Sequence, residues 1–163
     1  MSLEKTKELP VINKCGECTA CCTLLGVKSL QKDDYVKCQH ECAAGCAIYQ
    51  NRPKECGVYE CFWHQQYPGF SERFRPDKLR VICDLAESNG NWAIMVRELD
   101  EGVYDREDFI RNWVEYLAFK HSAFIVVVYK QNHRTIWTDW TRHLEGKINI
   151  QHKSWRDLPD EEE

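Results

Sequence analysis

The chain has 163 residues, of which 43% are hydrophobic and 12% aromatic, so one domain with a substantial core is expected and disulfides are not needed merely to fold it. The formal net charge is −4, but five acids fall within the last seven residues. Without them the chain has 22 basic and 21 acidic side chains. This balance argues against the broad basic surface of a protein that binds nucleic acid.

The first residues of the chain contain no targeting or membrane signal. Residues 1–14 predict a flexible arm and include no apolar stretch of the kind found in signal peptides. The longest apolar run, residues 123–129, is too short to cross a bilayer. We therefore expect a soluble cytoplasmic protein without a membrane partner, in a reducing compartment where free thiols persist.

Residues 15–77 predict a metal-binding region, because nine of the ten cysteines lie between residues 15 and 61. The first four follow the spacing C-x2-C-x2-C-C, and a tight turn with this spacing points two sulfurs at one metal ion. Hydrophobic periodicity is weak here, so coordination rather than an apolar face is expected to shape the segment. The candidate metal ligands are Cys15, Cys18, Cys21, Cys22, Cys38, Cys42, Cys46, Cys56 and Cys61.

Two other interpretations of these cysteines remain open. An even number of cysteines would suit a disulfide framework, although the missing signal peptide and the adjacent pair Cys21 and Cys22 argue against it. The spacing of four between Cys38, Cys42 and Cys46 also fits one face of a helix, although Gly45 makes a long helix unfavourable.

The ligand type limits the metal to soft or borderline ions. Thiolates suit zinc, copper(I) and iron–sulfur centres, and we expect zinc or iron, the latter alone or as an iron–sulfur cluster. Nine sulfurs are one more than two four-coordinate sites require, so either one thiol is spare or some sulfurs bridge two metals. His40 and His64 are candidates to replace a sulfur, and Arg52 and Lys54 are candidates to balance the thiolate charge.

Residues 78–140 predict an α+β region with the order β-β-α-β-β, packed beside the cysteine-rich region. Apolar residues alternate from Leu79 to Leu85 and from Trp92 to Val96. Asn89-Gly90 lies between these runs, which is typical of a hairpin. Cys83 alternates with the apolar residues of the first strand and is interpreted as part of the core rather than as a ligand.

The rest of this region predicts a helix and two more strands. Asp105 is a candidate N-cap for a helix whose residues at helical spacing are Phe109, Trp113, Tyr116, Leu117 and Lys120. Residues 124–129 are apolar on both faces and predict a central strand. A turn near Asn132 leads to a last strand at residues 135–138, and residues 141–163 predict a C-terminal extension with an acidic tail.

The cysteine pattern resembles that of the YkgJ-like cysteine-cluster family, also described as a CxxCxxCC zinc- or iron-chelating domain. The resemblance rests on the opening cysteine run and on the string G-C-A-I-Y-Q-N-R-P-K-E-C over residues 45–56. It extends through Cys38-Gln39-His40-Glu41-Cys42, Cys61-Phe62-Trp63 and Arg75-Pro76-Asp77. It implies metal chelation in a bacterial cytoplasm. Related domains occur in a flagellin lysine methylating protein, but no motif for a methyl-donating cofactor is present here.

Three functions are compatible with these observations. The first is a metal-binding cysteine-cluster protein in a structural or storage role, and the second is an iron- or iron–sulfur-dependent enzyme in redox or protein-modification chemistry. An exchangeable coordination position would favour the enzyme, and saturated four-thiolate sites the first function. The third is an interaction module whose protein partner binds exposed aromatic residues, for which the candidates are Trp137, Trp140 and Trp155.

Overall fold

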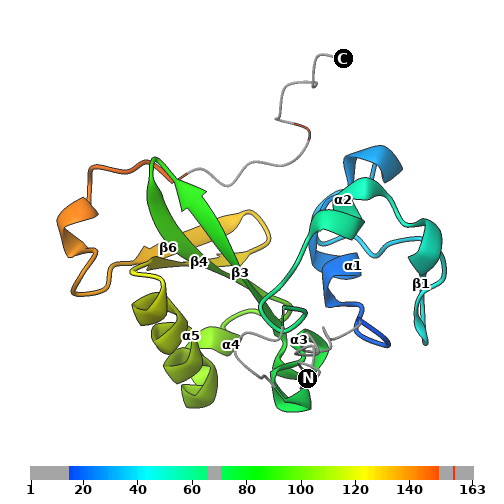
Figure 1. The fold of residues 1–163 in the computed structure, drawn as a ribbon, viewed down its shortest axis with the longest axis horizontal. Coiled ribbons are helices and arrows are strands. Elements are labelled where there is room, and N and C mark those ends of the chain that lie inside the picture. Colours follow the sequence, from blue (N-terminus) through cyan, green and yellow to red (C-terminus); the bar gives the residue numbers. More distant parts are fainter. Residues whose placement is uncertain (1–14, 66–70, 151–155, 157–163) are drawn as a thin grey trace, which may run out of the picture.

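The computed structural model describes residues 15–65, 71–150 and 156, and these residues form an α+β fold. Figure 1 shows two parts: a cysteine-rich part made of short elements and a part built on a four-stranded sheet. The short elements are α1 (Ala20–Leu24), β1 (Glu41–Cys42), β2 (Gly45–Cys46) and α2 (Lys54–Val58). The predicted flexible arm, the acidic tail and Trp155 lie outside the described residues.

The larger sheet has the predicted element order. Its strands are β3 (Val81–Ser88), β4 (Asn91–Glu98), β5 (Phe124–Tyr129) and β6 (Asn132–Ile136), in that spatial order. β4 and β5 are parallel, whereas the outer pairs are antiparallel. A parallel pair needs a long crossover, which here contains α4 (Val103–Arg106) and α5 (Asp108–Lys120). The order β-β-α-β-β and the interior position of residues 124–129 are confirmed.

The hairpin between β3 and β4 turns at the predicted residues. Asn89 and Gly90 both have positive φ, 51° and 76°, as a two-residue type I′ turn requires. The first strand begins at Val81 rather than at Leu79, because α3 (Pro76–Leu79) precedes it. Arg80 has a left-handed backbone, with φ 64°, and separates this short helix from the strand.

The last strand begins earlier than predicted. Tyr129 pairs with Asn132, so Lys130 and Gln131 form the turn, and the strand covers Asn132–Ile136 rather than residues 135–138. The chain leaves the sheet after Ile136 because Trp137 turns onto the sheet face, where its ring packs on Phe124 with centroids 5.1 Å apart.

The predicted cap of the main helix is wrong. Asp105 lies inside α4, and α5 starts at Asp108 after Glu107, whose side chain makes no capping hydrogen bond. The Asp105 carboxylate instead accepts a hydrogen bond from Arg134 Nη2 on β6, at 2.6 Å. Asp105 does not cap α5 because α4 includes it and Glu107 is the residue before α5, so its carboxylate is available to pair with β6.

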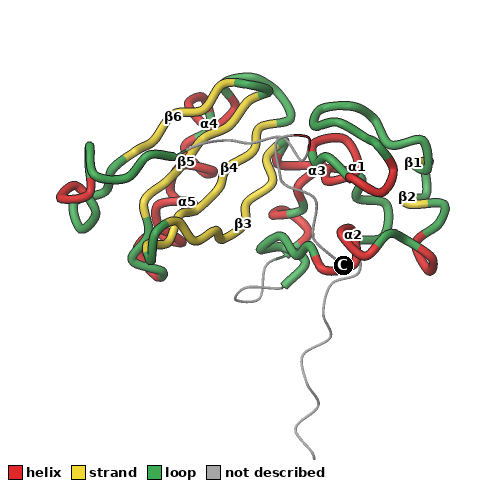
Figure 2. Tube along the Cα trace, turned by 90° about the horizontal axis from the view of Figure 1, so that it is seen from above, coloured by secondary structure: helices red, strands yellow, loops and turns green. Residues whose placement is uncertain are grey.

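The two faces of the sheet have different neighbours. Helix α5 covers one face with Ile110, Trp113, Val114, Leu117 and Ala118, whereas Tyr116 is exposed. On the opposite face, Ile82 packs against Ala20 and Leu24 of the cysteine-rich part. Figure 2 shows that part beside the β3 edge of the sheet. The sheet is therefore the surface on which the cysteine-rich part is built.

The tryptophans near the end of the chain are partly committed to packing. Trp137 lies on Phe124, as described above, while Trp140 Nε1 donates a hydrogen bond to the Ala123 carbonyl at 3.1 Å. The Trp140 ring also meets the exposed Phe119 ring edge-on, with centroids 5.7 Å apart.

Within the residues that the structure describes, no helix has the length and apolar character needed to cross a bilayer.

Candidate metal centre

The opening cysteine run forms a turn followed by a short helix. Cys18 N–H donates to the Cys15 carbonyl at 2.8 Å, and Gly16 between them has φ 53°. Helix α1 then begins at Ala20 and carries Cys21 and Cys22 in its first turns. The turn and the helix therefore present four sulfurs within one compact segment, as C-x2-C spacing predicts.

Cys38, Cys42 and Cys46 do not lie on a helix. Cys42 and Cys46 belong to the two-stranded ladder of β1 and β2, in which Cys42 pairs with Gly45. Gly45 has φ +114°, and an added Cβ there would lie 2.0 Å from the Gly16 carbonyl oxygen. Glycine is needed at this position because the hairpin packs directly on the backbone of the first cysteine turn.

The last two cysteines of the cluster come from α2 and the loop that follows it. Cys56 lies in α2, and the neighbouring Glu55 carboxylate accepts hydrogen bonds from Ser29 N–H at 3.0 Å and Ser29 Oγ at 3.1 Å. Cys61 Sγ accepts a hydrogen bond from His64 N–H at 3.4 Å. Phe62 N–H then donates to the Cys83 carbonyl at 2.9 Å, which attaches this loop to β3.

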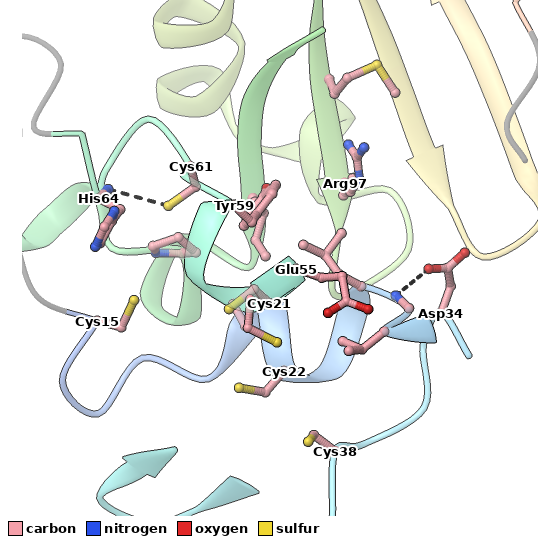
Figure 3. A pocket seen from close by; sticks show the side chains of 18 of the residues that line it. Cys15, Cys21, Cys22, Asp34, Cys38, Glu55, Tyr59, Cys61, His64 and Arg97 are labelled. Atoms are coloured by element: carbon pink, nitrogen blue, oxygen red, sulfur yellow. Dashed lines mark hydrogen bonds between the residues drawn. The ribbon is translucent and has the colours of Figure 1, made fainter. Parts of the chain in front are cut away.

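Eight of the nine candidate ligands line one cavity of about 640 Å³ between the cysteine-rich part and the sheet. Figure 3 shows Cys61 and His64 on one side of the cavity and Cys22 and Cys38 on another. The eight are Cys15, Cys18, Cys21, Cys22, Cys38, Cys46, Cys56 and Cys61. Cys42 is exposed and does not line it, and its thiol donates to the Gly45 carbonyl at 3.3 Å.

We group the eight thiols into two neighbouring sets by the effects that they have on one another's pKa, although one such effect crosses between the sets, since Cys22 raises the pKa of Cys15. In the first set, the pKa of Cys61 is raised to about 12, chiefly by burial and in part by Cys18 and Cys15. The pKa of Cys18 is raised to about 11, again chiefly by burial, with Cys15 contributing. We define the first set as Cys15, Cys18, Cys21 and Cys61.

The second set consists of Cys22, Cys38, Cys46 and Cys56. Burial raises the pKa of Cys56 most, and the nearby Cys22, Cys38 and Cys46 raise it further. The two sets meet at Cys21 and Cys22, where the Cys21 thiol donates a hydrogen bond to the Cys22 sulfur. This bond is the main reason that the pKa of Cys22 falls to about 7 and that of Cys21 rises.

The sulfurs share a cavity without converging on one point. In residues 15–65, 71–150 and 156, no group of three or more His, Cys, Asp or Glu side chains is arranged to hold a metal ion. The donor chemistry nevertheless fits zinc or iron, since eight thiols and the imidazoles of His40 and His64 line the same space. Rotation of the thiol side chains and closer approach of the segments that carry them would be needed for coordination.

Cations lie where thiolate charge would need compensation. Arg52 lines the cavity and stacks on the Tyr49 ring, with 4.0 Å between its guanidinium carbon and the ring centroid. Burial raises the pKa of Cys15, and the charge of Arg52 opposes part of that rise. Lys54 is not among the residues that line the cavity. Lys32, which the sequence analysis did not select, lines it and is buried.

Residue spacing did not single out Tyr59 and Arg97 at the cavity, or Asp84, which contacts both. Tyr59 Oη donates to Asp84 Oδ2 at 2.6 Å, and Arg97 Nη1 lies 3.2 Å from the same oxygen. Tyr59 and Arg97 line the cavity. The available signal was that Asp84 and Arg97 alternate with the apolar residues of β3 and β4 that face α5.

Cys83 is buried in the core between the sheet and α5, as predicted. Replacing it with alanine should leave the metal content unchanged and lower the free energy of unfolding by about 1 kcal/mol, because only a small buried group is lost. Elemental analysis and urea unfolding of the purified variant would test both expectations. Loss of a full metal equivalent would contradict the assignment and make Cys83 a ligand.

Comparison with known proteins does not show a family. No family model and no solved structure matches the chain. Tenascin of Gallus gallus is 41% identical to this chain over 44 residues, which are 27% of this chain and 2% of tenascin. The chain therefore spans a very small part of that relative, and this likeness carries no activity or partner over to it.

Proposed function

We propose that this protein chelates zinc or iron, the latter alone or as an iron–sulfur cluster, through its N-terminal cysteines. The observation that supports this most strongly is that eight cysteines from separate segments line one cavity. The resemblance of residues 15–77 to the YkgJ-like family points in the same direction. A bound metal would supply the folding free energy that the short elements around the cavity otherwise lack.

The two sets of thiols provide the ligands in this proposal. Each set has the four sulfurs that a closed tetrahedral site uses, and Cys42 is the spare thiol. Arg52 would balance part of the thiolate charge from the position in which it stacks on Tyr49. Thiolates of this kind persist in a reducing compartment, which supports a cytoplasmic location.

Cys42 and Cys46 offer a matched pair of variants, since both belong to the same small hairpin. In protein purified without oxygen, Cys46→Ser should lose about one metal equivalent, the content of one four-thiolate site. Cys42→Ser should keep the full content, because its hydroxyl can still donate to Gly45. Elemental analysis measures both, and strong visible absorption would select iron–sulfur over zinc.

Two results would contradict this proposal. One is a metal-free wild-type protein that keeps its fold with all ten thiols free. The other is an equal metal content in the two serine variants, which would show that the cavity does not distinguish ligands from the spare thiol.

The alternative function is an iron- or iron–sulfur-dependent enzyme in redox or protein-modification chemistry. One observation favours it: the cavity, at about 640 Å³, is far larger than metal ions require and has the size of small-molecule sites. An exchangeable coordination position, detected as a spectral change on adding a small ligand such as azide, would support the enzyme. Saturated four-thiolate sites would support the structural or storage role.

A further inference from the structure

The side of the cavity formed by the four-stranded sheet carries no cysteine. Ala93, Met95, Phe124 and Val126 line it from β4 and β5, and Leu25 and Val27 lie on the cysteine-rich side. Small-molecule sites typically combine such an apolar lining with a few polar groups, in a volume of about 300–1,000 Å³. The cavity volume of about 640 Å³ lies within this range.

Arg97 is the cationic group on this wall, which also includes Glu87 and Ser88 at the end of β3. Arg97 occupies β4 opposite Ile82 of β3 and Val128 of β5, so hydrophobic residues flank it on both neighbouring strands. Its side chain is only 19% exposed, and it lines the cavity. Figure 3 shows Arg97 on its strand, across the cavity from Cys22 and Cys38.

One nitrogen of the Arg97 guanidinium, Nη1, lacks a well-directed hydrogen bond within the described residues. This buried nitrogen lies 3.2 Å from Asp84 Oδ2. The same oxygen accepts the shorter 2.6 Å bond from Tyr59 Oη. A buried charged group with unused donors is costly unless a partner completes its hydrogen bonds.

A second cation that lines the cavity already makes hydrogen bonds. Lys32 Nζ donates to the carbonyls of Thr23, Leu25 and Asp33 at 3.3, 2.6 and 3.2 Å. Arg52 is stacked on Tyr49 and belongs to the side of the cavity that carries the thiols. An anion that enters along the sheet would therefore meet Arg97.

We propose that the sheet side of the cavity binds a small molecule with an apolar chain and a carboxylate, and that Arg97 binds the carboxylate. The planar guanidinium suits two parallel hydrogen bonds to a carboxylate, and the chain would lie against Met95, Phe124 and Val126. Asp84 and Asp34 near Arg97 favour a single negative charge over a doubly charged phosphate. This proposal does not depend on which metal, if any, the thiols bind.

Decanoate and its uncharged analogue decanamide are suitable probes, measured by calorimetric titration of the full-length protein as purified. Decanoate should bind, and decanamide should bind at least about tenfold more weakly, because a charge-assisted hydrogen bond is lost. In Arg97→Gln the affinity for decanoate should fall at least about tenfold and that for decanamide should change little. Equal affinities of the two probes for the wild-type protein, or no binding of decanoate, would overturn the proposal.

Arg80→Gln is the matched control, because Arg80 pairs with Asp100 on the surface and does not line the cavity. It should bind decanoate like the wild-type protein. Asp84→Asn should bind decanoate more tightly, because a competing carboxylate is removed from Arg97 while its shape is kept. Weaker binding in Asp84→Asn, or unchanged binding in Arg97→Gln, would show that Arg97 serves the fold alone.

Arg97→Gln leaves Asp84 without its ion-pair partner, so the variant is at risk of misfolding. The double variant Asp84→Asn/Arg97→Gln replaces both charges with neutral groups of similar shape and avoids this penalty. It should fold, keep the metal content of the wild-type protein and bind both probes with similar affinity. A preference for decanoate in this variant would place the carboxylate elsewhere, for example on a bound metal, and would overturn the role of Arg97.

Discussion

Removing the metal should abolish amide-exchange protection in residues 15–61 and spare most of the sheet and α5. Structural zinc contributes about 10–16 kcal/mol of apparent binding free energy in small peptides. Domains are typically stable by only about 5–15 kcal/mol. The cysteine-rich part has little to replace that contribution, since the buried residues of its cluster are Cys18, Ala20 and Leu24, packed on Ile82 of the sheet.

The sheet part has its own core, which no metal is needed to form. Fifteen buried residues in one cluster join β3, β4, β5 and α5, and all but Phe62 come from residue 81 onward. Hydrogen exchange measured before chelation, after it and after the metal is restored would test this partition. Equal loss of protection in both parts, or no loss in either, would contradict this division of the fold. Adding the metal back should restore protection in the cysteine-rich part.

Gly45→Ala should be the most damaging single substitution of a glycine in the described chain. The new Cβ would lie 2.0 Å from the Gly16 carbonyl oxygen, and the backbone has φ +114°. Strain in this region of φ and overpacking against a rigid backbone each cost about 1–3 kcal/mol, so we expect a loss of about 2–6 kcal/mol. The hairpin would move away from the first cysteine turn, and metal content should fall with stability.

Gly90→Ala is the control for Gly45→Ala. Gly90 also has positive φ, +76°, but nothing lies within 4 Å of the position that its Cβ would take. The control therefore measures backbone strain alone and should cost about 1 kcal/mol without loss of metal. Urea unfolding followed by circular dichroism, with elemental analysis of both proteins, gives the comparison. Similar losses in the two variants would show that the contact with Gly16 is unimportant.

Much of the sheet could be predicted because its signals are local. Alternation of apolar residues depends only on the two-residue period of a strand, and Asn89-Gly90 determines its own turn type. The unbroken apolar run at residues 124–129 indicated an interior strand because both of its faces are buried. The burial of Cys83 followed from the same alternation.

The errors arose where distant residues compete with local preferences. Asp105 was expected to cap α5, but it lies inside α4, and its carboxylate pairs with Arg134 on β6. The last strand was placed at residues 135–138 because a turn was expected near Asn132. In the structure, pairing with β5 includes Asn132, His133 and Arg134 regardless of their exposure. Backbone pairing in a ladder does not require apolar side chains.

The sequence by itself determined the kind of ligand available, the order of the elements and the concentration of thiols in residues 15–61. These properties depend on residue type and spacing alone. Only the tertiary structure decided which thiols share the cavity, because Cys42 and Cys46 lie in neighbouring pairs of one short ladder and only Cys46 lines the cavity. The tertiary structure also decided that Arg97 lines this cavity. Helix α5 covers one face of the sheet, and the cysteine-rich part packs on the other face, where Arg97 lies.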